Sequence, residues 1–242
     1  MNPFSKNSKR RLEGRVALIT GASRGIGAAV AKGFAQEGAH VVLLARTVGG
    51  LEAVDDAVRA TGGTATLLPI DLNNAQQIAQ LGPAIAQRFS KLDILVANAG
   101  ILGTLSPVAF SDPKGWEDVF RTNLIANYHL IRALDPLLRM SDAGRAIFVT
   151  SGVAHRPRPF WSAYGASKAA LEAMVATYAA EVAYSNLKVN ILDPGRVRTS
   201  MRAEAFPGED PATLRTPDSI IESFITLAAP ELQKTGEVVI AA

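Results

Sequence analysis

The chain has 242 residues, of which 48% are hydrophobic, enough to bury one sizeable core within a single α/β domain. Cysteine is absent, which excludes disulfide bonds and thiolate metal sites and fits a reducing compartment, so we expect a cytoplasmic protein without a bound metal. The longest uncharged stretch, Ile94 to Ser111, is interrupted by glycine, asparagine and proline, so it cannot form a membrane-spanning helix. No signal peptide is visible, and we expect a soluble protein without a membrane partner.

The positive charge is concentrated at the amino terminus. The formal net charge is +3, from 25 basic and 22 acidic residues. Residues 1–15 hold five basic residues and one acidic residue, which leaves 20 basic and 21 acidic residues in the rest of the chain. The basic segment lacks interleaved aromatic residues and an apolar helical face, so we expect no nucleic-acid partner. We predict a flexible tail over residues 1–14 and one domain over residues 15–242.

A glycine-rich turn follows the first predicted strand. Val16 to Thr20 is an apolar run typical of a buried strand, and Gly21-Ala22-Ser23-Arg24-Gly25-Ile26-Gly27 leads from it into a helical pattern that ends near Glu37. Glycines at such a junction let the backbone approach a pyrophosphate, and the helix amino terminus attracts its negative charge. The alternative is a glycine turn that binds nothing.

The second strand, His40 to Leu44, ends in Ala45 and Arg46. A carboxylate that binds the ribose 2′-hydroxyl of NAD usually lies near this position, and here it is missing. An arginine instead offers charge-assisted hydrogen bonds to a 2′-phosphate, which contribute about one to two powers of ten in affinity. Together with Arg24, this favours NADP(H) over NAD(H), unless both arginines are merely solvated.

Two more strands are expected at Ala65–Leu68 and Leu92–Val96, with a helix at about 51–59 before the first of them. Asp71-Leu72 follows the first of these strands, and Asp71 is predicted to cap a helix that runs to Phe89. Asn98-Ala99-Gly100 follows the second strand. There Asn98 is expected to tie neighbouring strands together.

A serine, a tyrosine and a lysine form the clearest chemical pattern in the chain. Ser151 follows the apolar run Ala146–Thr150, and Tyr164 and Lys168 stand at positions i and i+4 of a helical pattern. These two side chains share one helix face, so we expect the ammonium group to lower the pKa of the phenol. The tyrosine would then transfer protons, and the serine would hold a substrate oxygen. The alternative is a core aromatic residue beside a solvated lysine.

These motifs resemble the short-chain dehydrogenase/reductase family, in its compact single-domain branch. The serine stands thirteen residues before the tyrosine, and the likeness extends from Arg15 to Ile240. It implies an α/β fold with a Rossmann-like, doubly wound parallel sheet of about seven strands and helices on both faces. The implied activity is hydride transfer between NADP(H) and a carbonyl or secondary alcohol substrate.

The resemblance also implies roles for individual residues. Its catalytic group corresponds to Asn123, Ser151, Tyr164 and Lys168, with the asparagine in a long helix that runs to about Met140 and holding a water beside the lysine. Asp71 would bind the adenine amine, and Thr199 would bind the nicotinamide carboxamide. The full set of implied cofactor contacts is Gly21, Ser23, Arg24, Gly25, Ile26, Gly27, Arg46, Asp71, Leu72, Asn98, Ala99, Gly100, Tyr164, Lys168, Pro194, Gly195, Val197 and Thr199.

The carboxyl-terminal part of the chain is expected to cover the substrate. A strand at Val189–Leu192 precedes an irregular lid at about 196–217, followed by a helix at about 218–228 and a strand at Glu237–Ile240. Candidate substrate contacts are apolar, aromatic or basic; they are His155, Phe160, Trp161, Ile101, Leu102, Met201, Phe206, Arg156, Arg158, Arg196 and Arg198. The chain ends in Ile-Ala-Ala, which differs from the tail of many members.

Three alternatives remain to be weighed against a carbonyl reductase. An enoyl reductase of the superfamily would separate the tyrosine and the lysine by six residues, which argues against it here. A non-catalytic dinucleotide-binding sensor or scaffold tends to lose one of the two, and both are present. A nucleic-acid-binding role rests on the basic tail alone. The family often forms homodimers or homotetramers through the helices expected at about 121–140 and 162–184.

Overall fold

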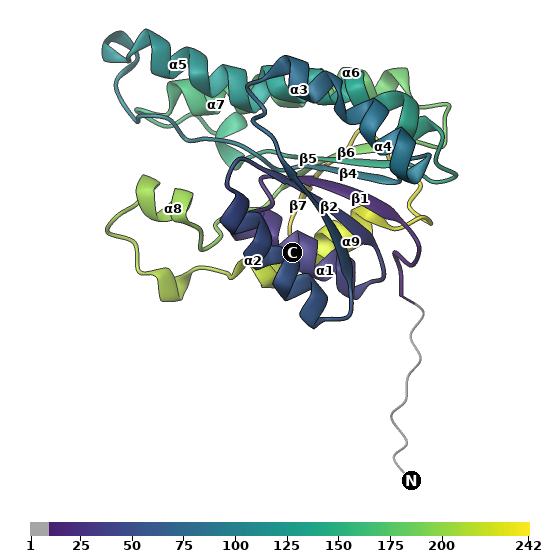
Figure 1. The fold of residues 1–242 in the computed structure, drawn as a ribbon. Coiled ribbons are helices and arrows are strands. Elements are labelled where there is room, and N and C mark those ends of the chain that lie inside the picture. The colour runs from purple at the N-terminus through teal and green to yellow at the C-terminus, as the bar shows by residue number, and fades with distance from the viewer. Residues whose placement is uncertain (1–9) are drawn as a thin grey trace.

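Seven parallel strands form one sheet in the order β3-β2-β1-β4-β5-β6-β7 (Figure 1). The computed structural model describes residues 10–242. Most of the strands are short apolar runs buried on both faces, as parallel strands covered by helices require. Their bounds are Val16–Thr20 (β1), His40–Ala45 (β2), Thr64–Pro69 (β3), Ile94–Ala97 (β4), Arg145–Val149 (β5), Lys188–Asp193 (β6) and Val238–Ile240 (β7).

Helices cover both faces of the sheet, which is the predicted doubly wound arrangement (Figure 1). One layer contains α1, α2 and α9, and the other contains α3, α4, α6 and α7. The bounds are Gly25–Gln36 (α1), Val48–Ala60 (α2), Ala75–Ala79 (α3), Leu81–Phe89 (α4), Pro113–Phe120 (α5), Ala126–Arg139 (α6), Ser162–Glu181 (α7), Ser200–Ala205 (α8) and Ile221–Ala228 (α9).

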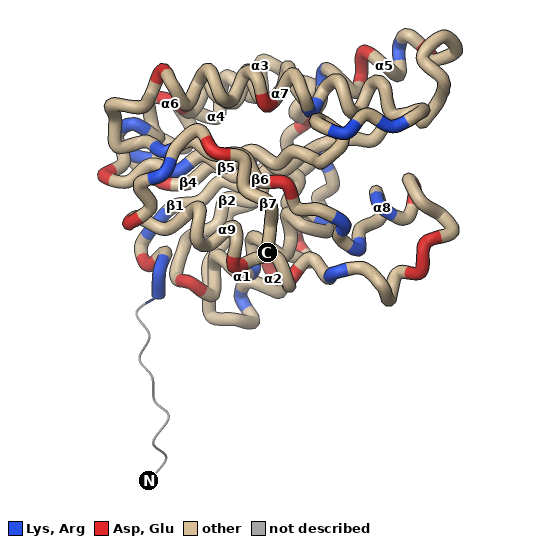
Figure 2. The backbone as a smooth tube through the Cα atoms, turned by 180° about the vertical axis from the view of Figure 1, so that it is seen from behind, with Lys and Arg blue, Asp and Glu red and all other residues tan. Residues whose placement is uncertain are grey.

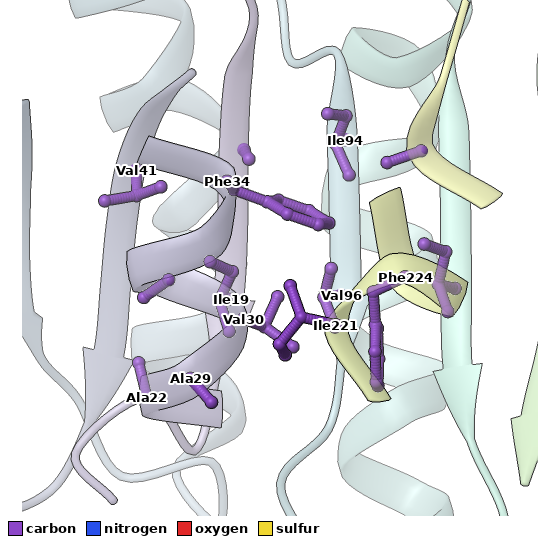
Figure 3. Close-up of a cluster of buried hydrophobic side chains, with 14 of the residues drawn as sticks. Ile19, Ala22, Ala29, Val30, Phe34, Val41, Ile94, Val96, Ile221 and Phe224 are labelled. Carbon is purple, nitrogen blue, oxygen red and sulfur yellow. The ribbon is translucent and has the colours of Figure 1, made fainter. Parts of the chain in front are cut away.

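A separate apolar core fills the space between the sheet and each layer. In the first core, Phe34 of α1 and Phe224 of α9 pack against Ile19 and Val96 of the central strands (Figure 3). In the second, Leu130 of α6 and other aliphatic side chains of α4, α6 and α7 pack on the opposite face. Because all the strands run parallel, their carboxyl ends lie together at one end of the sheet, which is where ligands bind in folds of this kind.

Acidic and basic positions are interspersed over both helical layers (Figure 2). The charges of residues 10–242 also form many pairs at the surface, such as Arg59 with Asp55 in α2 and Arg139 with Asp135 in α6. Within residues 10–242, no helix is long and apolar enough to span a bilayer.

The amino-terminal boundary predicted at residue 15 is wrong. Leu12 is fully buried in the first core, its backbone N–H donates to the carbonyl of Glu37 at 3.0 Å, and Arg11 forms an ion pair with Glu222. The segment is fixed to the domain because Leu12, the apolar residue within this basic run, packs in the core with side chains of α1 and α9. Residues 1–9 of the predicted tail lie outside the described residues.

The sequence-based assignment is also corrected at two helices. The predicted helix to Phe89 is two helices, because Pro83 has no N–H to donate to the carbonyl of Ala79. Its amino-terminal cap is Asn74, which accepts from two backbone N–H groups, and not Asp71, which lies too far from the first helical residue. Within the expected irregular segment 196–217, Ser200–Ala205 is helical.

We expect Leu12→Ala to lower the free energy of unfolding by about 2–4 kcal/mol, because it removes a fully buried side chain and leaves a cavity. Chemical denaturation measures this loss. Arg10→Ala, at an exposed neighbouring position, is the control and should change stability by less than about 0.5 kcal/mol. Equal stability of the two variants would show that the domain begins after residue 12.

Candidate active site

A cleft of about 540 Å³ lies at the carboxyl ends of the strands. Two walls come from the glycine turn and the ends of β2 and β4, and the others come from β5, α7 and the loop after β6. Of the predicted cofactor contacts, all but Gly27 line it: Gly21, Ser23, Arg24, Gly25, Ile26, Arg46, Asp71, Leu72, Asn98, Ala99, Gly100, Tyr164, Lys168, Pro194, Gly195, Val197 and Thr199. Residues scattered over most of the chain therefore share one site.

The glycine turn brings the backbone close to this cleft. Gly27 is buried beneath the turn, where a Cβ atom would overlap the carbonyl oxygen of Gly21. Gly21 and Gly25 have φ angles of +65° and +56°, which other residues adopt at a cost. The turn thus offers backbone N–H groups at the amino terminus of α1, an arrangement that suits a phosphate.

Two exposed arginines lie at this end of the cleft. Arg24 is the residue before α1, and Arg46 directly follows β2. Ala45, where a ribose-binding carboxylate is usual, is buried in the cleft wall. The local charge is therefore positive at the place where a 2′-phosphate would lie.

Asn98 links the glycine turn to the end of β4, as predicted. Its side-chain nitrogen donates to the carbonyl of Thr20 at 3.0 Å, and its backbone N–H donates to the Thr20 hydroxyl, also at 3.0 Å. The Thr20 hydroxyl accepts a second bond from Ala99, again at 3.0 Å. At Gly100 a Cβ atom would lie 3.2 Å from Asn123 Oδ1, which is a tight contact, and 3.5 Å from Lys168 Nζ, so this position faces both side chains.

Ser151, Tyr164 and Lys168 all line the cleft. Ser151 follows β5 in extended backbone, whereas Tyr164 and Lys168 are buried side chains of α7. Lys168 Nζ donates to the carbonyl of Val149 at 2.8 Å and lies 5.8 Å from the centre of the Tyr164 ring. The structure thus brings together the hydroxyl, the phenol and the ammonium group that the sequence singled out.

The predicted lowering of the tyrosine pKa is wrong for this structure. Burial raises the pKa of Tyr164 to about 12, although a hydrogen bond with Ser151 opposes the shift. Burial also lowers the pKa of Lys168 to about 8, and the carboxylate of Glu172 opposes that change. The physical reason is that withdrawal from water penalises the charged form of both groups more than their neighbours favour it.

Asn123 lies beside the cleft but does not line it. It is fully buried in a π-helical turn, Arg121–Ile125, between α5 and α6. Its side-chain nitrogen donates to the Ile101 carbonyl and to Ser167 Oγ, each at 3.0 Å, and its side-chain oxygen accepts from Ile101 N–H at 2.9 Å. The amide thus fixes the turn after Gly100 against α7, and the predicted water contact stays a prediction.

The predicted substrate contacts divide into two groups. Ile101, Leu102, Trp161 and Met201 line the cleft. The others do not line it, and His155 is paired with Glu172 instead; they are His155, Phe160, Phe206, Arg156, Arg158, Arg196 and Arg198.

Trp161 lies between Tyr164 and the segment after β6. Its ring is edge-on to Tyr164 at 5.9 Å and packs against Phe206 at 5.5 Å. The Arg202 guanidinium lies 3.7 Å from the centre of the Phe206 ring and is paired with Glu209. Thr199 caps α8 by accepting from Arg202 N–H at 3.1 Å. This set of contacts fixes α8 beside the cleft.

Sequence reasoning missed several residues that line the cleft. Thr47 and Asn73 lie next to predicted contacts at the ends of β2 and β3, so their positions at strand ends were a usable signal. Val149 and Thr150 at the end of β5 carried the same signal. Residues from helices and from the interior of β2 carried no such signal in the sequence; they are Asp118, Thr122, Arg202, Ala205 and Leu44.

Comparison with known proteins agrees with this geometry. The family model described as short chain dehydrogenase matches residues 15–210. The oxidoreductase YciK of Escherichia coli K12 is 40% identical over 232 residues, which cover 93% of this chain and 90% of YciK. A short chain dehydrogenase of Shigella flexneri complexed with NADP has a TM-score of 0.92 at 38% identity, with 96% and 98% of the two chains covered. One of E. coli CFT073 complexed with NADPH has a TM-score of 0.91 at 39% identity, again with 96% and 98% covered. The chain therefore belongs to the short-chain dehydrogenase/reductase family and is an oxidoreductase acting on alcohol or carbonyl groups.

Proposed function

We propose that this oxidoreductase transfers hydride between NADP(H) and a carbonyl or secondary alcohol substrate. The observation that carries the proposal is the convergence of Ser151, Tyr164 and Lys168 in the same cleft as the glycine turn. Hydride transfer requires a dinucleotide and a proton donor at adjacent positions, and this cleft offers groups for both.

The residues present fit a nicotinamide dinucleotide. The missing side chain of Gly100 leaves room in front of Lys168, and the turn from Gly21 to Gly27 presents backbone to the phosphates. NADP(H) in preference to NAD(H) is supported by the two arginines, Arg24 and Arg46, and by the relatives that were solved with NADP and NADPH. Bound cofactor would supply the hydride, and the protein supplies orientation and the proton.

In the reducing direction, Tyr164 gives its proton to the substrate oxygen as hydride reaches the carbonyl carbon, which yields the alcohol. The raised pKa of Tyr164 keeps the phenol protonated at neutral pH, as a proton donor requires. The Ser151 hydroxyl donates a hydrogen bond to the same oxygen. Lys168 in its charged form stabilises the phenolate that remains and binds ribose hydroxyl groups, and Asn123 acts by holding the turn that faces Lys168.

The substrate end of the cleft favours a neutral compound with an apolar or aromatic substituent. Its wall consists of Ile101, Leu102, Trp161 and Met201, and Arg202, the cation that the described α8 contributes to the cleft, is neutralised by Glu209. An anionic substituent there would find no unpaired cation on α8, so the burial of its charge would be offset poorly. We propose that the segment 196–217, with α8, acts as the lid over this end.

The preference for NADPH depends on Arg46 if the proposal is correct. We expect Arg46→Ala to weaken NADPH binding by at least tenfold while leaving NADH binding within about twofold, since only NADPH has the 2′-phosphate. Fluorescence titration measures both affinities. Arg59→Ala, at an exposed arginine of α2 outside the cleft, is the matched control. If NADH binds wild type as tightly as NADPH does, the assignment of Arg46 is wrong.

Removal of the tyrosine hydroxyl should stop the chemistry but preserve binding. We expect Tyr164→Phe to lower kcat by about 100-fold or more, because a positioned proton donor contributes about that factor. The affinity for NADPH should stay within about threefold. Tyr184→Phe, at a fully exposed position, is the control and should keep wild-type turnover. Retained turnover in Tyr164→Phe would favour another donor, and retained binding without any turnover in wild type would favour the sensor alternative.

The aromatic wall can be tested with paired ketones. We expect Trp161→Ala to raise KM for an aryl ketone by about tenfold, because an aromatic contact is lost, and to leave KM for a small aliphatic ketone nearly unchanged. Trp116→Ala removes the other tryptophan, which stacks on Phe120 at 4.1 Å outside the cleft, and serves as the control. Equal changes for the two ketones would place the substrate elsewhere.

A further inference from the structure

Glu172 is a buried carboxylate in α7 that the reaction described above does not use. It lies four residues after Lys168, and therefore on the same face of the helix, and it is 7% exposed. The Thr150 hydroxyl donates to one carboxylate oxygen, and His155 Nε2 lies 2.7 Å from the other. A carboxylate at this depth is costly without partners, and here each oxygen has one.

The two partners of Glu172 lie on either side of Ser151 in the sequence. Thr150 directly precedes the serine, and His155 follows the short 3-10 turn Gly152–Ala154. That turn begins at the serine itself, whose carbonyl accepts from Ala154 N–H at 2.9 Å. Glu172 therefore contacts both ends of the segment that carries the Ser151 hydroxyl.

A third contact joins the same segment to α7. Lys168 Nζ donates to the carbonyl of Val149, the last residue of β5. The segment from Val149 to His155 is thus tied to α7 at three points, and two of them are the oxygens of Glu172. The position of the serine relative to Tyr164 depends on these contacts, since both hydroxyls must reach one substrate oxygen.

Glu172 also acts on the charge of Lys168. Burial lowers the pKa of the lysine, and the nearby carboxylate opposes that change. The other titratable and charged groups around this centre are Tyr164 on α7, His155 on the segment after β5, and Asp193 at the end of β6, which acts on the tyrosine. Glu172 is the acidic neighbour that favours the charged form of the lysine.

We propose that Glu172 is a positioning residue, which holds Thr150 and His155 against α7 and thereby sets the place of Ser151 beside Tyr164. The proposal rests on the proposed function, because it explains how the hydroxyl of the serine is kept beside the tyrosine. The two contacts of Glu172, with Thr150 and with His155, differ in strength. The Thr150 contact is fully buried, whereas the His155 side chain is 61% exposed and borders an outer hollow of about 310 Å³.

The direct test is Glu172→Gln, with Glu181→Gln on the exposed end of the same helix as the matched control. We expect kcat for ketone reduction to fall by about tenfold or more in Glu172→Gln and to stay unchanged in the control. The pH dependence of NADPH affinity gives a second readout, because the affinity weakens as Lys168 loses its proton. Without the carboxylate the lysine loses its proton at lower pH. The alkaline limb of the NADPH-affinity profile, which is the pH range over which the affinity falls, should therefore move to lower pH in Glu172→Gln alone. Wild-type kcat with an unmoved limb would overturn the proposal.

A second pair of variants serves if Glu172→Gln does not fold. Thr150→Ser keeps the hydroxyl, and Thr150→Val keeps the shape without it. We expect kcat to fall by about tenfold in Thr150→Val and by less than about threefold in Thr150→Ser, with little change in NADPH affinity for either. His155→Ala should have a smaller effect than Thr150→Val, because an exposed pair is weakened by solvent. Equal kcat in the serine and valine variants would overturn the proposal.

The two proposals fail in different ways. If Tyr164→Phe keeps its turnover, the proposed function loses its proton donor, whereas the alkaline limb of NADPH binding still tests the action of Glu172 on Lys168. If Tyr164→Phe is inactive while Glu172→Gln matches wild type in both readouts, the reaction stands and the positioning role is excluded.

Discussion

The pairing of β1 with strands on both of its sides is the constraint on which the whole site depends. Ile19 pairs with Leu43 of β2 on one side and with Val96 of β4 on the other. From β1 the chain builds the sheet outward in one direction, and after β3 it returns to build in the other. The two loops at the carboxyl ends of β1 and β4 therefore separate, and a crevice opens between them. The Thr20 hydroxyl at the end of β1 fixes the loop after β4 at the base of the crevice, because it accepts from the backbone N–H groups of both Asn98 and Ala99.

Burial of charge controls the chemistry in that crevice. A charged lysine favours the phenolate form of an adjacent tyrosine, but Tyr164 and Lys168 are both withdrawn from solvent, and the loss of hydration opposes both charged forms. In such surroundings the neutral forms are favoured, and charge persists only where a partner offsets its desolvation. The carbonyl of Val149 and the carboxylate of Glu172 fill that role for the lysine. Tyr164 therefore stays protonated at neutral pH, whereas Lys168, whose pKa is lowered to about 8, lies close to the balance between its charged and neutral forms.

The proposed substrate wall and the proposed proton donor share structural support in this molecule. Trp161 precedes α7, the helix of Tyr164, and packs against Phe206 at the end of α8. The loop that holds α8 is tied back to the domain by Arg215, which donates to the carbonyls of Pro194 and Ala241 at 3.0 and 3.1 Å. The Ala241 carbonyl at the carboxyl-terminal end therefore helps to hold the segment that is proposed as the lid. A change in the shape of the proposed substrate wall would also affect the position of Tyr164, the proposed proton donor.

Local patterns in the sequence were enough for the fold and for many of the residues around the cleft, although not for all of them. Short apolar runs, glycines after β1 and an i to i+4 pair on one helix each depend on neighbours that are close in sequence. For this reason the predicted elements agree widely with the structure, and all the predicted cofactor contacts except Gly27 line one cleft. The roles of those contacts stay predictions. Other features depend on groups that meet only after folding, and no local pattern contains them. The burial of Leu12, the occupied amide of Asn123, the high pKa of Tyr164 and the two-sided hold of Glu172 on the Ser151 segment are of this kind. Burial depth and partner identity are properties of the packed chain, so the sequence determined which groups are available, and the tertiary structure decided their surroundings and protonation.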